Sequence, residues 1–439
     1  MFKICMVGTG YVGLVSGACL ADFGNRVMCV DIDEARIDSI RAGVMPIYEP
    51  GLKDIVERNH AAGRLLFTAD LRGAVKESSV VFSAVGTPQR EDGSCDLAAV
   101  FQAAKDVASH MGEYTVFVQK STVPVGTSER VGEIMRERVK GAATFDRVSN
   151  PEFLREGSAI EDFMRPNRVV IGVESDRARD IMREIYRPLY LLETPIVFTT
   201  IRTAELVKYA SNAFLATKIS FINEIAELCE KVGADVDVVA RSIGLDRRIG
   251  AKFLHAGVGY GGSCLPKDVA AIIRTAEEAG SPLRIIRAAD EVNRSLMDRL
   301  IEKMRTELSS FDGRTIAVLG LSFKPNTDDI REAPALRLID RILAEGALVH
   351  AYDPAAMEHV RRIYGDRIAF FGDSYSAVAG ADAGWPNAAS GPHNATAAGS
   401  RTTSGGAARR SRKVNLRAAR TGRGRGPIPG RPGLPAARR

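Results

Sequence analysis

The chain has 439 residues, of which 45% are hydrophobic and 26% charged, a balance typical of globular proteins with two or three domains. The formal net charge of +6 comes from residues 384–439, which hold 12 of the 60 basic residues and no acid, so the body carries 48 basic against 54 acidic side chains. This mildly acidic body gives no reason to expect nucleic acid as a partner, and no apolar run of about 18 residues predicts a membrane span.

The first 200 residues predict a parallel sheet covered by helices. Apolar runs typical of buried strands span 2–8, 26–31, 80–88, 115–123 and 168–173. Helical stretches separate them, and this alternation favours βαβ units. We therefore expect a Rossmann-type domain over 1–200.

A glycine-rich turn follows the first predicted strand and opens a helix. Gly8, Gly10 and Gly13 form the pattern G-x-G-x-x-G, in which backbone N–H groups can receive a pyrophosphate. Asp31 ends the next strand and can accept a hydrogen bond from the adenosine ribose. The pattern favours NAD over NADP, although Arg36 leaves a phosphate contact open.

The middle of the chain changes to long helical periodicity. Residues 202–232 contain no Gly or Pro, and their apolar residues recur at helical spacing. Such a helix is about 45 Å long and suits a spine between domains or a subunit interface. We expect a central helical domain over 201–300.

A second Rossmann-like unit is predicted over 301–383. Strands are expected at 315–323 and 347–354, with a helix over 333–346 between them. After 377–383 the periodicity ends. Residues 384–439 are rich in Gly, Ala, Ser, Pro and Arg, a composition that predicts a disordered tail.

The six cysteines are scattered, without CxxC pairs or zinc-ligand spacing. This favours a reducing cytoplasm and no disulfide framework, and no metal constellation stands out among the six histidines.

Cys264 is the exception among the thiols. It lies in GYGGSCLPKD (259–268), where Pro266 suits the first position of a helix. A helix start and the neighbouring Lys267 both favour thiolate over thiol. Two preceding glycines would let a substrate reach the sulfur. These features favour a nucleophile, although most cysteines are inert core residues.

Other polar pairs leave two interpretations open. Lys208 and Asn212 share one face of the long helix, and Glu152 and Glu156 stand four residues apart in NPEFLREG (150–157). The loop after the strand at 315–323 carries Lys324 and Arg331 at the sheet edge where ligands bind. Each pair could equally be solvated surface charge.

Taken together, the motifs resemble the UDP-glucose 6-dehydrogenase family, within the wider nucleotide-sugar dehydrogenases. The resemblance covers positions 1 to about 383. It rests on VGTGYVG (7–13), PIYEPGL (46–52), VGTPQREDG (85–93), STVPVGT (121–127), NPEFLREGSAIEDFMRPNRVVIG (150–172), ELVKYASNAFLATKISFINEIA (205–226), DRRIGAKFLHAGVGYGGSCLPKD (246–268) and LGLSFKPNTDDIREAP (319–334).

The resemblance implies that a primary alcohol is oxidised to a carboxylate by two hydride transfers to NAD. Cys264 would attack the intermediate aldehyde, giving a thiohemiacetal and then a thioester that is hydrolysed. Lys208 would stabilise the developing oxyanion, and Asp268 and Asn212 would position a water together with Thr122. Glu152 would serve in the acid–base steps.

Binding residues follow from the same resemblance. The expected NAD contacts are Gly8, Gly10, Tyr11, Val12, Gly13, Asp31, Arg36, Thr87, Thr122, Glu156, Lys267 and Arg331. The expected substrate contacts are Glu152, Phe153, Leu154, Glu156, Lys208, Asn212, Phe253, Leu254, His255, Ala256, Gly257, Gly261 and Lys324. Arg248 would reach the substrate of a partner subunit in a homodimer. UDP-glucose is the expected substrate, and GDP-mannose or a UDP-N-acetylhexosamine is the alternative.

The carboxyl end departs from the family pattern. The family continues after ADA (381–383) with a further strand, a helix and a segment whose Arg contacts substrate, whereas this chain turns to its basic tail. The switch indicates a shifted reading frame, and the alternative is a genuine basic tail that could bind polyanions nonspecifically. A shifted frame predicts an incomplete third domain, and hence a chain that binds NAD but turns over poorly.

Overall fold

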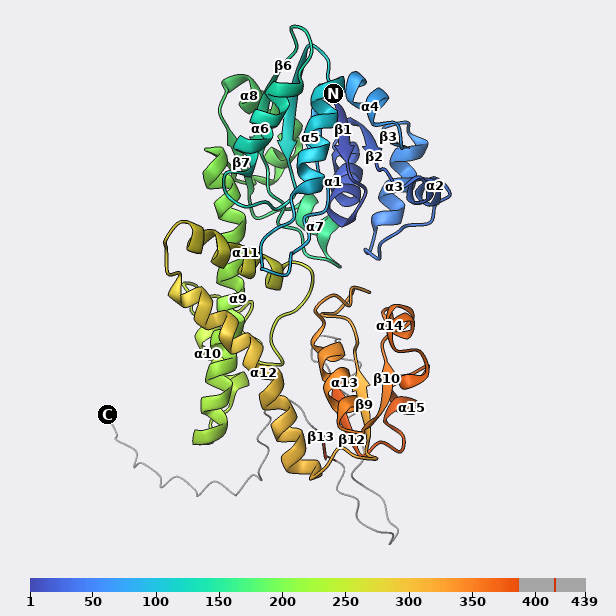
Figure 1. Cartoon of the computed structure of the whole chain (residues 1–439), viewed down its shortest axis with the longest axis vertical. Coiled ribbons are helices and arrows are strands. Elements are labelled where there is room, and N and C mark those ends of the chain that lie inside the picture. The colour runs from blue at the N-terminus through green and yellow to red at the C-terminus, as the bar shows by residue number, and fades with distance from the viewer. Residues whose placement is uncertain (387–413, 416–439) are drawn as a thin grey trace, which may run out of the picture.

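The computed structural model describes residues 1–386 and 414–415. Figure 1 shows an N-terminal α/β domain at the top, a group of central helices beside and below it, and a smaller α/β domain at the lower right. Among the described helices, none has both the length and the apolar character needed to cross a membrane.

The N-terminal domain is built on a sheet of strand order β3-β2-β1-β4-β5-β6-β7-β8. All neighbouring strands are parallel except β6 and β7, which pair antiparallel at Val148 and Val173. The order of β3 to β6 is that of the dinucleotide-binding α/β fold. The strands are β1 (Lys3–Val7), β2 (Arg26–Val30), β3 (Leu65–Thr68), β4 (Val80–Ser83), β5 (Tyr114–Gln119), β6 (Thr144–Ser149), β7 (Val169–Val173) and β8 (Ile196–Thr199).

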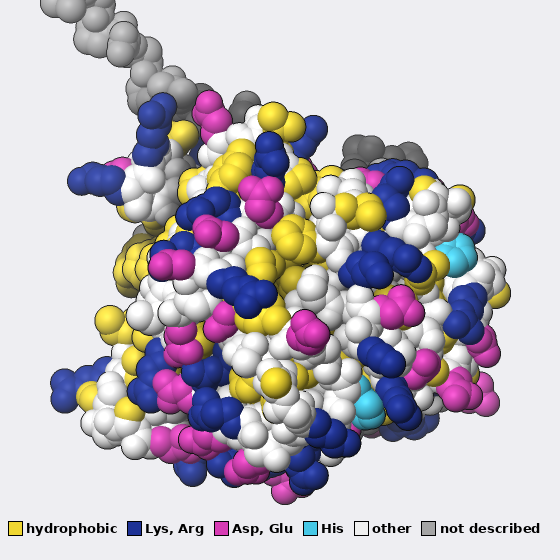
Figure 2. All heavy atoms as spheres, turned by 90° about the horizontal axis from the view of Figure 1, so that it is seen from above, with side chains coloured by type: hydrophobic (Ala, Val, Ile, Leu, Met, Phe, Trp, Pro, Cys, Tyr) yellow, Lys and Arg dark blue, Asp and Glu magenta, His cyan; other side chains and the backbone are white. Residues whose placement is uncertain are grey.

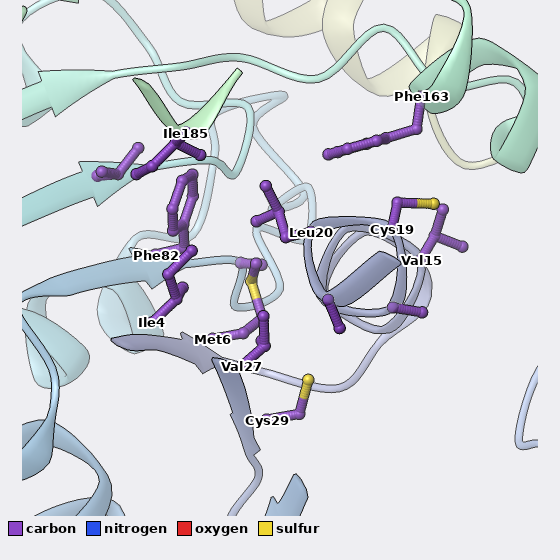
Figure 3. Packing of buried hydrophobic residues seen from close by; sticks show 14 of the residues in the cluster. Ile4, Met6, Val15, Cys19, Leu20, Val27, Cys29, Phe82, Phe163 and Ile185 are labelled. Carbon is purple, nitrogen blue, oxygen red and sulfur yellow. The ribbon is translucent and has the colours of Figure 1, made fainter. Parts of the chain in front are cut away.

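Helices cover both faces of this sheet (Figure 1). They are α1 (Tyr11–Asp22), α2 (Glu34–Arg41), α3 (Leu52–Ala61), α4 (Leu71–Glu77), α5 (Ala98–His110), α6 (Thr127–Arg138), α7 (Ala159–Met164), α8 (Asp176–Ile185) and the 3₁₀ helix η1 (Arg187–Leu192). On one face, Met6, Leu20 and Phe82 point toward one another between the sheet and α1, as Figure 3 shows, and all three are fully buried. Burial of such side chains stabilises the fold by about 1.5–3 kcal/mol each.

The sequence predictions are confirmed for the long apolar strands. The expected runs at 2–8, 26–31, 80–88, 115–123 and 168–173 contain β1, β2, β4, β5 and β7. The strands β3, β6 and β8 were missed because they are short or only partly buried. In β6, for example, the first residues are exposed or half-buried, so the strand lacks a continuous apolar run.

The central helices join the two sheets. The longest, α9, runs from Ile201 to Val232 and confirms the predicted long helix. It begins at the N-cap Thr200, whose side chain accepts from the Thr203 N–H, and ends at Gly233 in the left-handed region. The other helices of this group are α10 (Val236–Gly244), α11 (Leu265–Glu278) and α12 (Arg284–Leu308).

The C-terminal domain contains a smaller parallel sheet of strand order β11-β10-β9-β12-β13 within the described residues. The predicted strands at 315–323 and 347–354 and the helix at 333–346 are confirmed. Its elements are β9 (Thr315–Leu319), α13 (Pro334–Ala344), β10 (Leu348–Tyr352), α14 (Met357–Tyr364), the 3₁₀ helix η2 (Gly365–Arg367), β11 (Ala369–Phe370), α15 (Ser374–Val378), β12 (Ala383–Pro386) and β13 (Val414–Asn415).

The predicted disorder from residue 384 onward is wrong at two places. Residues 384–386 continue β12, which pairs in parallel with β9, and Trp385 is buried against the domain core. Residues 414–415 form β13 and pair with β12. Burying the single Trp of the chain offsets the weak strand propensity of its Gly and Pro neighbours. The rest of the predicted tail lies outside the described residues.

Figure 2, which views the molecule from the N-terminal domain, shows basic and acidic side chains intermixed over that face. This distribution agrees with the nearly balanced charge of the body.

Candidate active site

The glycine-rich turn has the geometry that a dinucleotide requires. Gly8 has φ +96°, and a Cβ there would lie 2.8 Å from the Ala84 carbonyl oxygen, while a Cβ on Gly13 would lie 1.9 Å from the Gly8 carbonyl oxygen. A Cβ on Gly10 meets nothing within 4 Å, and Gly10 caps α1 without a side chain. The start of α1 is thus uncapped by a side chain and has space beside Gly10, as a pyrophosphate site requires.

Asp31 lies directly beside this turn, at the end of β2. Its Oδ2 accepts from the Thr9 N–H and Thr9 Oγ1, both at 2.7 Å, and pairs with Arg36 at 3.3 Å. Burial alone would raise the pKa of Asp31, but these donors outweigh burial and lower it. The side chain is therefore an ionised acceptor at the position expected for a ribose contact.

Tyr11 and Val12 occupy the first turn of α1 and are half-buried. The Tyr11 hydroxyl donates to Glu49, which also accepts from the N–H groups of Gly157 and Ala159. Glu49 belongs to the PIYEPGL segment and was not predicted as a site residue. Its carboxylate ties the dinucleotide turn to the 150–157 loop.

One face of α9 carries buried polar side chains that each bind a different segment. Glu205, Lys208 and Asn212 stand at i, i+3 and i+7, and each is 7% exposed or less. Their partners are the start of α6, the 150–157 loop and the start of α11, respectively. Their burial excludes the alternative that Lys208 and Asn212 are solvated surface groups. Three segments of the candidate site are therefore bound to one face of α9.

Lys208 and Glu152 form a buried ion pair. Lys208 Nζ lies 3.0 Å from Glu152 Oε1, and both side chains are 5% exposed. Glu152 Oε2 accepts from the Leu154 N–H, and Lys208 Nζ lies 5.5 Å from the centre of the Phe153 ring. Burial lowers the pKa of Lys208, but the fields of Glu152, Asp268 and Cys264 outweigh burial and keep it raised. Lys208 is therefore a permanent cation in the site.

Asp268 lies on the first turn of α11 and is almost fully buried. Its Oδ2 accepts from Asn212 Nδ2 and its Oδ1 from Lys267 Nζ, each at 2.6 Å. The network places an amide and a carboxylate side by side in the same site as the Lys208 ammonium.

Cys264 is the N-cap residue of α11, which confirms the predicted helix start, although Pro266 occupies the second helical position. Burial lowers the pKa of the neighbouring Lys267, but the charges of Asp268 and Cys264 outweigh burial and raise it, and its ammonium also binds Asp268. Burial raises the pKa of the Cys264 thiol, as do the charges of Glu152 and Asp268, whereas Lys208 lowers it. The net effect is a raised pKa, against the predicted thiolate, and Lys208 is the cation that opposes this most.

The two glycines before Cys264 lie close against the C-terminal domain. A Cβ on Gly261 would lie 2.1 Å from the Glu332 carbonyl oxygen, and one on Gly262 would lie 2.6 Å from the Phe323 ring. The Gly262 N–H also donates to the Arg331 carbonyl oxygen. The close approach is therefore to the C-terminal domain.

Glu156 joins the three parts of the chain. It accepts from Ser263 Oγ at 3.2 Å and Thr327 Oγ1 at 3.4 Å, and lies 3.5 Å from Arg331 Nη2. Burial raises the pKa of Glu156 to about 7, and Asp329 adds to this effect. Neither Ser263 nor Thr327 was predicted, because a hydroxyl in a loop carries no sequence signal of its partner.

The predicted contacts in two further loops lie beside this centre. Thr87 Oγ1 donates to the Thr122 carbonyl oxygen at 3.1 Å, joining the loops after β4 and β5. Lys324 is half-buried, and burial lowers its pKa, while Glu156 and Cys264 act in the opposite direction.

The 246–257 segment differs from the centre described above in that two of its predicted contact residues are exposed to solvent. Arg248 is 90% exposed and pairs with Asp246, and His255 is also exposed. Leu254 is buried, and the Gly257 N–H donates to Asn223 Oδ1. Phe253 has φ +67°, an uncommon value for a residue with a Cβ. Ala256 is half-buried.

Comparison with known proteins decides the family. Three models of the UDP-glucose/GDP-mannose dehydrogenase family match in succession: its NAD binding domain at residues 2–190, its central domain at 202–295 and its UDP binding domain at 317–385. The chain belongs to this family. The three matches follow the order of the N-terminal sheet, the central helices and the C-terminal sheet.

Named relatives agree. The chain is 54% identical to the UDP-glucose 6-dehydrogenase of Rhizobium meliloti over 385 residues, 87% of this chain and 88% of the relative. It is 51% identical to the UDP-glucose 6-dehydrogenase TuaD of Bacillus subtilis over 87% of this chain and 82% of the relative. A solved UDP-glucose dehydrogenase from Pyrobaculum islandicum superposes with a TM-score of 0.85 at 40% identity, covering 88% of this chain and 90% of that one.

Proposed function

We propose that this protein oxidises UDP-glucose to UDP-glucuronate with NAD. The observation that carries the proposal is the convergence of Cys264, Lys208, Asp268, Asn212 and Glu152 around the start of α11, in a chain of the UDP-glucose/GDP-mannose dehydrogenase family. UDP-glucose is preferred because the relatives named above are UDP-glucose dehydrogenases.

The residues present fit NAD. The glycine turn offers uncapped N–H groups at the start of α1, and Asp31 offers an ionised acceptor for a ribose hydroxyl. Tyr11, Val12, Thr87, Thr122, Glu156, Lys267 and Arg331 are proposed to complete the cofactor contacts. When bound, NAD supplies the acceptor for a hydride in each of the two oxidations.

The side chains supply the remaining chemistry. Lys208 stabilises negative charge on the oxygen of the reacting carbon, and Glu152, its ion-pair partner, exchanges protons there. Cys264 adds to the aldehyde, which provides the tetrahedral C–H bond that the second oxidation needs. The resulting thioester is hydrolysed by a water held by Asn212 and Asp268 with Thr122.

Substrate contacts are proposed along the loops that surround this centre. The proposed contacts are Phe153, Leu154, Glu156, Gly261, Lys324 and Phe253 to Gly257. Of these, Glu156 and Gly261 contact the C-terminal domain. Arg248, which is exposed and pairs with Asp246, is proposed to reach the substrate of a neighbouring subunit. The proposed domains are 1–200, 201–300 and 301–383, and residues 384–386 extend the third because they continue β12.

The exposed apolar side chains of α9 support the proposal that the protein is a homodimer. Leu206, Phe214, Phe221 and Leu228 are each 46–65% exposed, and their spacing places them along one side of the helix. Such a stripe of exposed apolar side chains is typical of a subunit interface. The cytoplasm is the proposed location, because all six cysteines, which lie in the described part of the chain, are free thiols.

Substrate preference is tested by measuring NADH formation in parallel with UDP-glucose, GDP-mannose and UDP-N-acetylhexosamines. We expect kcat/KM for UDP-glucose to exceed the others by at least about 100-fold, since a site that binds a particular sugar hydroxyl rejects analogues that lack it. Equal or greater kcat/KM with another nucleotide sugar would overturn the assignment.

A further inference from the structure

The start of α6 is capped by a side chain from another domain. Gly126, the residue before the helix, has φ +94° and no side chain to accept from the first-turn N–H groups. Glu205 of α9 takes that place, accepting from the Gly126 N–H at 2.7 Å and the Ser128 N–H at 2.9 Å. A carboxylate at a helix N-terminus is favoured both by these bonds and by the helix dipole.

This contact is buried and specific. Glu205 is 2% exposed, and burial raises its pKa, while its bonds to the Gly126 and Ser128 backbone oppose that effect. The charged groups near it are Glu129 of α6 and Arg202 of α9, which form their own exposed ion pair. A buried carboxylate that accepts from two backbone N–H groups fixes the position of that backbone.

The backbone that Glu205 holds belongs to the same loop as Thr122, a predicted site residue. Thr122 lies four residues before Gly126 in the same loop, and its carbonyl oxygen accepts from Thr87 Oγ1. On α9, the residues one and two turns after Glu205 are Lys208 and Asn212, which bind the other two segments of the site. One helix therefore sets the distances between the Thr122 loop, the Lys208 ammonium and the Asn212 amide.

We infer that Glu205 is a positioning residue for thioester hydrolysis, holding the 121–127 loop so that Thr122 lies in register with Asn212 and Asp268. In this step a water oxygen adds to the thioester carbonyl carbon, the C–S bond breaks, and the Cys264 thiol and the product carboxylate form with release of a proton. Loosening the loop slows this step more than the two oxidations. The inference rests on the proposed function.

The test compares Glu205→Gln, which keeps one acceptor, and Glu205→Ala with the control Glu129→Gln. Glu129 lies in the first turn of α6 and pairs with Arg202 of α9 at the surface, so its substitution removes an α6–α9 contact without touching the capped N–H groups. Intact mass during turnover of UDP-glucose with NAD reports the fraction of chains carrying a covalent intermediate on Cys264.

We expect both Glu205 variants to lower kcat about 10-fold or more, with KM for UDP-glucose within about threefold, and to accumulate the covalent adduct. The Glu129 control should match the wild type in both. Loss of kcat without an adduct, or the same loss in the control, overturns the inference.

Hydrogen exchange of residues 121–128 gives a readout that is independent of activity. The amides of Gly126 and Ser128 should exchange at least about 10-fold faster in Glu205→Ala than in Glu129→Gln. Unchanged protection would contradict the positioning role. A wild-type chain without turnover would refute the proposed function. The exchange rates would still show whether Glu205 holds the backbone of residues 121–128.

Discussion

At the scale of single residues, the buried ion pair of Lys208 and Glu152 links the stability of the fold to the proposed chemistry. Its 3.0 Å separation and 5% exposure mean that neither charge has water as an alternative partner. Removing one partner of a buried pair leaves the other charge uncompensated, which costs about 3–5 kcal/mol. Lys208 also has the raised pKa of a cation held among three acidic groups.

Lys208→Met should therefore lower both the free energy of unfolding, by roughly 3 kcal/mol, and kcat, by about 100-fold or more. Urea unfolding followed by circular dichroism and steady-state NADH formation measure the two effects. The double variant Lys208→Met/Glu152→Gln should recover most of the stability but not the rate. If the double variant stayed as unstable as the single one, the buried pair would not be the cause.

Glu156 makes stability depend on pH. Its pKa of about 7 in the folded protein lies above the value of 4.5 expected in the unfolded chain. Between these values the folded state binds more protons than the unfolded state, so the contribution of Glu156 to stability falls as pH rises from about 4.5 to 7.

Glu156→Gln mimics the protonated form and should remove this loss. The difference in the free energy of unfolding between variant and wild type should therefore be more favourable to the variant at pH 8 than at pH 5, by roughly 1–3 kcal/mol. Urea midpoints at the two pH values measure the difference. A variant whose midpoint shifts in parallel with the wild type would show that Glu156 is ionised throughout.

At the scale of elements, α9 is the part of the molecule from which the site is assembled. Its buried polar side faces three loops, and its exposed apolar side is available to a second subunit. The helix itself was predictable, because 31 residues without Gly or Pro at helical spacing have few alternatives. Its partners were not, since the pattern of one helix does not record which distant loops bind it.

The same contrast holds for the other elements. The glycine turn, Asp31 and the helix start at Cys264 could be placed from local sequence, since each depends on its immediate neighbours. The bond from Lys267 to Asp268 and the packing of Gly261 and Gly262 against the C-terminal domain depend on tertiary structure, which the local sequence does not record. The burial of Trp385 in β12 likewise depends on the neighbouring strand β9.

The exposed side of α9 gives a test of the dimer. Phe221 is 47% exposed near the middle of the stripe, so Phe221→Asp places a charge at the proposed interface and should convert a dimer into a monomer. Analytical ultracentrifugation measures the change. Tyr375→Asp is the matched control, because Tyr375 is 63% exposed on α15, away from α9. A wild-type monomer, or a Phe221→Asp dimer as stable as the wild type, would exclude this interface.

At the scale of the whole molecule, the site depends on contacts among all three parts of the chain. Glu156 of the N-terminal domain binds Ser263 beside Cys264 and also Thr327 and Arg331 of the C-terminal domain. A nucleotide sugar held between the sheets would thus be bound by residues that only the folded chain brings together. We therefore expect turnover to depend on the C-terminal sheet as well as on the thiol.

The most direct measurement of the central claim is the yield of NADH from a limiting amount of UDP-glucose with excess NAD. The account predicts two NADH and one UDP-glucuronate per UDP-glucose for the wild type, because both oxidations occur at one site. Cys264→Ser should form no carboxylate, because the serine hydroxyl is a much weaker nucleophile than a thiolate. No NADH from the wild-type chain, one NADH per UDP-glucose, or full carboxylate formation by Cys264→Ser would contradict the account.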